Sequence, residues 1–164
     1  MPMKRRDARE LAFTFLFEQS FADEPVLPLI AAAEVHREVT FDAFARSLCI
    51  YVTENRDAID EKIAHHATRW SVGRLPRVTL TLLRMCIAEM DAMEEVPVSV
   101  SINEAVELCK RFATEEDAAF LNGVLGAYAK GGQVRVDLPR QTTPEVEPDD
   151  EVFFADEEGE ESDG

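Results

Sequence analysis

Residues 78–93 are the segment that most limits how this chain can fold, because they are apolar on nearly every side of a helix. A surface helix keeps a polar stripe toward water, whereas a helix that is apolar all round must be enclosed by other helices. The segment therefore predicts an all-α fold built around one central helix. Its apolar residues are Leu80, Leu82, Leu83, Met85, Cys86, Ile87 and Met90.

The other helices are predicted from apolar residues that recur three and four positions apart. This spacing predicts helices over residues 3–20, 41–52 and 55–70, one after Pro97 with a stripe that ends at Phe112, and one over residues 114–129. Pro25 and Pro28 leave room for a short helix over residues 29–34. We therefore expect about seven helices and no strand.

Two helix starts carry capping signals. Ser101 and Glu104 have the spacing of a capping box, in which each side chain binds a backbone N–H of the first turn. Thr114 is followed by three acidic residues, which place negative charge at the positive end of the helix dipole. Both patterns predict that a helix begins at the hydroxyl residue.

The charge divides the chain into two parts. The net charge is −16, but residues 137–164 hold twelve acidic residues and Arg140 as their one basic residue, a net of −11. A segment of this composition cannot bury enough apolar surface to offset its ordering entropy. We expect a helical domain over residues 1–136 and a disordered acidic tail over residues 137–164.

The first predicted helix has a basic face. At 100° per residue, Arg5, Arg6 and Arg9 lie within about 100° of one another, and Phe13 and Phe17 follow on the same side. Arginine binds phosphate through a planar fork and stacks on bases, so this pattern favours single-stranded RNA. The alternative is a solvated N-terminus in which both phenylalanines pack under neighbouring helices.

No pattern of catalytic or metal-binding residues stands out. Cys49, Cys86 and Cys109 are far apart and fit neither a zinc pattern nor a disulfide framework, which is typical of a reducing cytoplasm. The neighbours His65 and His66 point to different helix faces, so they cannot chelate one metal ion. The basic start is not followed by a short apolar run with a small-residue cleavage site, so we expect no export signal, and no apolar run reaches membrane-spanning length. We expect a cytoplasmic protein that is not an enzyme and needs neither a cofactor nor a metal.

Three segments resemble the NusB family of transcription antitermination factors. They are the basic opening over residues 4–12 (KRRDARELA), the stretch over residues 97–110 (PVSVSINEAVELCK) and the stretch over residues 120–125 (FLNGVL). Leu82, Leu83 and Arg84, with Glu89 behind them, fit the central helix of the family. Cys109 departs from the pattern, which usually has alanine there, and the acidic tail lies outside the family domain.

The resemblance implies a fold of two helical lobes, about three helices in the first and four in the second. It also implies binding to the boxA element of ribosomal RNA leader transcripts, together with the ribosomal protein NusE, in an antitermination complex on RNA polymerase. Two other functions stay open. One is an RNA-recruiting module like that of some ribosomal RNA methyltransferases, against which the lack of a Rossmann segment after residue 136 argues. The other is a protein-interaction module that uses Phe13 and Phe17.

The resemblance also implies which residues contact RNA. Arg5, Arg6 and Arg9 fall in the arginine-rich opening of the family, and Lys4 extends it. The start of the last helix adds Glu116, Asp117 and Phe120 as secondary candidates. Phe120 has an alternative as a core residue, because it continues the apolar stripe of its helix.

Overall fold

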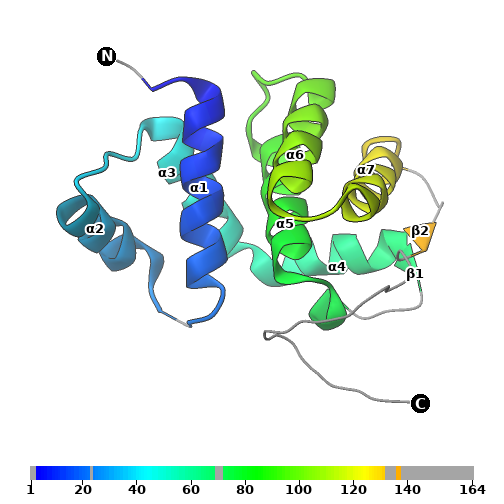
Figure 1. The fold of residues 1–164 in the computed structure, drawn as a ribbon, viewed down its shortest axis with the longest axis horizontal. Helices are drawn as coiled ribbons and strands as arrows, with labels where there is room; N and C mark the ends of the chain where they lie inside the picture. Colours follow the sequence, from blue (N-terminus) through cyan, green and yellow to red (C-terminus); the bar gives the residue numbers. More distant parts are fainter. Residues whose placement is uncertain (1–2, 23, 69–71, 132–135, 138–164) are drawn as a thin grey trace.

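The computed structural model describes residues 3–22, 24–68, 72–131 and 136–137. Within these ranges it contains seven α-helices, so the predicted all-α fold is confirmed (Figure 1). Residues 138–164, most of the predicted tail, lie outside the described residues. The helices are α1 (Arg5–Gln19), α2 (Val26–Arg37), α3 (Ala43–Glu54), α4 (Arg56–His66), α5 (Arg77–Ala92), α6 (Val98–Phe112) and α7 (Glu115–Ala129), with a short 3-10 turn, η1 (Val72–Arg74), before α5.

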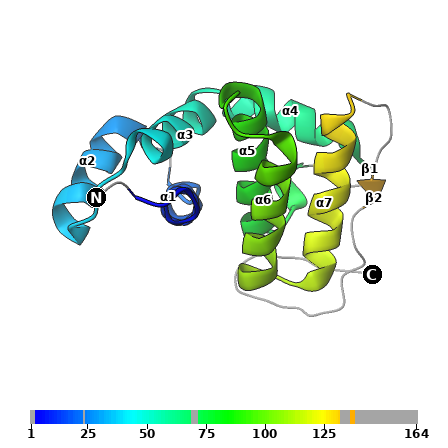
Figure 2. The same ribbon diagram turned by 90° about the horizontal axis from the view of Figure 1, so that it is seen from above.

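The helices form two lobes, as expected. The first three make one lobe and α4 to α7 make the other (Figures 1 and 2). Helix α1 lies at the junction, because it packs against α3 on one side and α5 on the other. Both faces of α1 are therefore partly covered, and its first turn lies where the two lobes meet.

Helix α5 is the centre of the second lobe. It packs against α1, α3, α4, α6 and α7, and it is the helix that was expected to be enclosed. Leu82, Leu83 and Ile87 are at most 1% exposed. The all-round apolar pattern therefore predicts the position of this helix correctly.

Two helix starts differ from the prediction. Helix α2 begins at Val26, before Pro28, because a proline in the first turn removes only an N–H that has no partner within the helix. Helix α6 begins about one turn before Ser101, since the Pro97 carbonyl accepts the first bonds from the N–H groups of Val100 and Ser101. The predicted capping box is therefore wrong. The predicted Thr114 cap is confirmed, with Oγ1 accepting from the Asp117 N–H at 2.9 Å.

A two-residue parallel pair was missed by the sequence analysis. Strand β1 (Ala67–Thr68) follows α4 and pairs with β2 (Val136–Asp137). Helix α4 ends at His66, so Ala67 and Thr68, which the prediction placed in a helix over residues 55–70, lie in the strand. Trp70, at the end of that predicted helix, lies outside the described residues. Asp137, assigned to the tail, belongs to the pair. A pattern of two residues is too short to show the alternation that predicts a strand.

A buried ion pair ties α1 to the second lobe. The Arg9 guanidinium donates from Nε and Nη2 to the Glu89 carboxylate of α5, the shortest distance being 2.6 Å. Ser101 Oγ of α6 donates to the same carboxylate at 2.7 Å. The side chains of Arg9 and Glu89 are 5% and 3% exposed. Three helices therefore share one buried network.

Removing one partner of this network should destabilise the fold strongly. In Glu89→Ala the Arg9 charge stays buried without the carboxylate that accepts its hydrogen bonds, which costs about 3–5 kcal/mol of unfolding free energy. Urea unfolding measures the loss. The control is Glu10→Ala, which breaks the pair of Glu10 with Arg111, whose side chains are 38% and 54% exposed. An exposed pair contributes little, so equal losses in the two variants would contradict the role of burial.

We propose that the folded domain ends with β2 and that residues 138–164 add nothing to its stability. A chain truncated after Asp137 should then unfold at the same temperature as the full chain. Truncation after Gly131 removes β2 and should lower that temperature, which makes it the matched control. Thermal unfolding followed by circular dichroism compares the three chains. A lower melting temperature for the chain that ends at Asp137 would contradict the proposed boundary.

Candidate RNA interface

The first turn of α1 holds three exposed basic residues, Lys4, Arg5 and Arg6, which we call the basic turn. Lys4 is the N-cap and makes no side-chain capping bond, and Asp7 is the acidic residue of the first turn. Positive side chains at this end oppose the helix dipole, so they cost stability rather than adding to it. An anion bound here would relieve that repulsion.

Arg5 lies over an aromatic ring of the first lobe. Its guanidinium carbon is 4.1 Å from the centroid of the Phe44 ring on α3. One nitrogen, Nη1, is 3.8 Å from Glu95 Oε2, in a loose pair between two side chains that are 46% and 63% exposed. The cation–π contact restricts the guanidinium plane while its side chain stays half exposed.

Arg6 is held from the other lobe. Its Nε and Nη2 donate to the two carboxylate oxygens of Glu104 on α6, at 3.1 and 2.8 Å. These bonds and the charge of Glu104 raise the pKa of Arg6. The bonds, with the charges of Arg6 and Arg9, hold the pKa of Glu104 below its usual range despite its partial burial. Arg5 and Arg6 are therefore fixed by different lobes.

Arg9 is not part of an exposed basic face, although the spacing of 100° per residue places it beside Arg5 and Arg6. Its side chain is buried against Glu89, so its guanidinium cannot reach an RNA phosphate in this structure. The reason is the position of α1 between two lobes. A wheel with one buried face assigns Arg9 to solvent, whereas α5 covers that side of the helix.

The start of α7 lies away from the basic turn. Helix α6 lies between α1 and α7 in both views (Figures 1 and 2). Glu116 is exposed, and burial raises the pKa of the Asp117 carboxyl. Phe120 is 4% exposed and belongs to the core, so its ring offers no stacking face for a base. RNA contacts by Glu116 and Asp117 stay predictions.

A row of aromatic rings along α1 was not predicted as a unit. Phe13 contacts Phe17 and Phe112, and Phe17 contacts Phe21, with centroids 5.2–5.9 Å apart. We call these four rings the aromatic strip. Phe13 is buried, but Phe21 and Phe112 are 64% and 43% exposed. Arg77 stacks on Phe21 at 4.4 Å, and Arg111 stacks on Phe112 at 4.9 Å. The four-residue spacing of phenylalanines at positions 13, 17 and 21 is the sequence pattern from which the strip could have been predicted.

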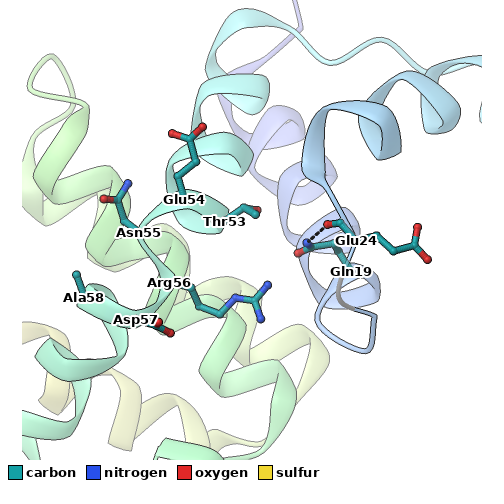
Figure 3. A pocket seen from close by; sticks show the side chains of 8 residues that line it. All are labelled: Gln19, Glu24, Thr53, Glu54, Asn55, Arg56, Asp57 and Ala58. Carbon is teal, nitrogen blue, oxygen red and sulfur yellow. Dashed lines mark hydrogen bonds between the residues drawn. The ribbon is translucent and has the colours of Figure 1, made fainter.

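A polar hollow of about 340 Å³ lies where α3 passes into α4, facing the end of α1 (Figure 3). Two of its lining residues are joined by a hydrogen bond, in which Gln19 Nε2 donates to the Glu24 carbonyl at 3.3 Å. Acidic and amide side chains dominate its wall. The lining residues are Gln19, Glu24, Thr53, Glu54, Asn55, Arg56, Asp57 and Ala58.

The described residues contain no cluster of three or more side chains suited to a metal ion. The cysteines are buried, and burial raises the pKa of Cys49 to about 12 and of Cys109 to about 11, so these thiols stay protonated. Among the described helices, none has the length and apolar character needed to cross a bilayer.

The comparisons with known proteins agree on one family. The model of the NusB family matches residues 6–130. The transcription antitermination protein NusB of Bacillus licheniformis is 41% identical over 124 residues, which are 75% of this chain and 94% of that protein. Its counterpart in Bacillus subtilis is 42% identical over 123 residues, 75% of this chain and 92% of that protein.

Solved structures give the same result. NusB of T. maritima superposes with a TM-score of 0.70 at 32% identity, covering 81% of this chain and 95% of that one. A crystal structure of the antitermination factors NusB and NusE in complex with dsRNA matches with a TM-score of 0.69 at 26% identity, covering 77% of this chain and 96% of that one. Sequence and two-lobed helical fold together show that the chain belongs to the NusB family.

Proposed function

We propose that this protein is an RNA-binding transcription antitermination factor. It binds a boxA-type ribosomal RNA leader together with NusE and promotes antitermination on RNA polymerase. It acts in the cytoplasm and catalyses no reaction. The names of its relatives support this function, as does the similar structure that contains NusE and RNA.

The observation that carries the proposal is the basic first turn of α1. The chain has a net charge of −16, yet Lys4, Arg5 and Arg6 gather at the end of a helix where positive charge is unfavourable. Local positive charge, rather than net charge, decides whether a surface attracts phosphate. Arg5 and Arg6 are also fixed by neighbours, which reduces the entropy lost when they bind.

The start of α7 has a secondary role in this proposal. The carboxylates of Glu116 and Asp117 are acceptors, so they suit base amino groups and 2′-hydroxyls better than phosphates. Phe120 supports this turn from the core without touching RNA. The exposed Glu116 is the member of this group that reaches solvent most fully.

The aromatic strip supports a second, protein-binding face. Exposed aromatic rings and arginines are the residue types that contribute most to protein interfaces. Phe21 and Phe112 are exposed large apolar residues, and each has an arginine stacked on it. We propose that NusE packs on this strip while RNA contacts the basic turn at the start of α1.

Replacing the arginines should weaken RNA binding and its salt dependence together. Three exposed cations predict a log–log salt slope of about −2 for an unpaired strand, and Arg5→Ala or Arg6→Ala should each reduce its magnitude by about 0.7. Filter binding of a boxA leader RNA, with NusE present, measures both quantities. A duplex competitor shows whether the unpaired form is preferred.

The control for this experiment is Arg37→Ala. Arg37 is an exposed arginine on α2 that pairs with Glu18, so its removal changes the net charge equally. Its affinity and salt slope should match those of the parent. If Arg37→Ala weakens binding as much as Arg6→Ala, general charge and not the basic turn holds the RNA.

Removing a ring of the aromatic strip should weaken NusE binding without changing RNA binding. Phe21→Ala removes an exposed ring and should weaken NusE binding at least about tenfold, as the loss of an interface anchor does. The affinity of the chain alone for RNA should not change. Val35→Ala on α2 is the matched control, because Val35 is 72% exposed and lies outside the strip. Calorimetric titration with NusE tests this, and unchanged binding by Phe21→Ala would contradict the assignment.

A further inference from the structure

Among the described residues, Glu104 is the one acidic side chain that accepts two hydrogen bonds from a residue of the basic turn. It comes from α6, while Arg6 comes from α1, and the residues are 98 positions apart. The Arg6 side chain is 69% exposed, whereas that of Glu104 is 13% exposed. The carboxylate therefore lies beneath the guanidinium and does not cover it.

The geometry of the pair leaves half of the guanidinium free. Arginine has five N–H donors, and Glu104 uses one on Nε and one on Nη2. The other three are on Nη1 and Nη2. Two parallel donors are what a phosphate accepts in a bidentate contact. The edge between Nη1 and Nη2 can therefore bind a phosphate while the other edge stays on Glu104.

Glu104 is itself held in place. Its Oε1 is 4.0 Å from Nη1 of the buried Arg9, whose other nitrogens bind Glu89. Arg6 is therefore linked through Glu104 to the buried network that joins α1, α5 and α6. A long exposed arginine loses rotamer freedom when it binds, and a support that fixes it beforehand reduces that loss.

We propose that Glu104 is a positioning residue for RNA binding, which holds Arg6 by its Nε–Nη2 edge and presents the opposite edge to an RNA phosphate. This inference rests on the proposed function and names a residue that acts through Arg6 without touching RNA. The competing role for Glu104 is repulsion. In that case its negative charge repels the RNA phosphate, and its hydrogen bonds to Arg6 compete with those that the phosphate would accept.

Three substitutions of Glu104 distinguish positioning from repulsion. Glu104→Asp keeps the charge but shortens the side chain, so it loses the hold on Arg6. Glu104→Gln loses the charge and keeps one acceptor for the Nε–H. Glu104→Ala loses both. Positioning predicts that the Asp and Ala variants weaken RNA affinity about threefold to tenfold and that the Gln variant weakens it less. Repulsion predicts that the Gln and Ala variants bind more tightly.

The decisive measurement is a double-mutant cycle with Arg6→Ala, by filter binding at fixed salt. If Glu104 acts through Arg6, Glu104→Ala should have no effect in the Arg6→Ala background. Glu107→Ala is the control for loss of a nearby acid, because Glu107 acts on Arg6 by charge without a hydrogen bond. It should leave affinity unchanged or raise it slightly. Circular dichroism confirms that each variant is folded.

The outcomes separate this inference from the proposed function. If the parent binds no leader RNA, both fail. If the parent binds and Arg6→Ala has no effect, the inference fails while RNA binding stands. Tighter binding by Glu104→Ala, or an equal effect of Glu104→Ala with and without Arg6, also overturns it.

Discussion

The buried pair of Arg9 and Glu89 is the interaction on which the arrangement of the two lobes depends. Two charges removed from water cost several kcal/mol each unless their hydrogen bonds are satisfied. Here both guanidinium donors facing α5 are used, and Ser101 supplies a further donor to the carboxylate. The Glu89 carboxylate thus accepts hydrogen bonds from both α1 and α6. It therefore specifies how α1 lies against α5 and α6, which apolar packing alone would leave less strictly defined.

This constraint sets the geometry of the basic turn. Arg5 and Arg6 precede Arg9 by about one helical turn, so fixing Arg9 places Arg5 over Phe44 of the first lobe and Arg6 over Glu104 of the second. The basic turn is therefore assembled from both lobes although its residues are consecutive. The aromatic strip begins at Phe13, one turn after Arg9 on the same helix, and extends to Phe21 just after α1 and to Phe112 at the end of α6. Helix α1 thus carries the proposed RNA contact in its first turn and leads to the proposed protein contact, whose exposed rings lie just after α1 and at the end of α6.

The sequence predicts the features that depend on one element and misses those that depend on several. The enclosure of α5 follows from its own apolar pattern, and the cap at Thr114 follows from a hydroxyl beside three acids. Arg9 was misplaced because a helical wheel assumes one covered face, and α1 has two. Ser101 was read as a cap because spacing does not show where a helix begins, and the carbonyl of Pro97 begins it earlier. The β1–β2 pair joins residues 69 positions apart through two residues each, which is too little pattern to recognise.

Pairing the arginines with acids changes what the basic turn selects. A free cluster of cations attracts any polyanion, and its affinity is mostly electrostatic and independent of sequence. Glu104 offsets the charge of Arg6 and Glu95 partly offsets that of Arg5, so the basic turn attracts distant polyanions less strongly than three unpaired cations would. The contact that Arg6 adds is directional, because Glu104 holds one edge of its guanidinium and leaves the other edge free. A surface of this kind gives up general affinity for nucleic acid and gains dependence on where the phosphate lies. That suits a protein that must bind one site on a transcript in the presence of many others, because the position of a phosphate then matters as well as its charge.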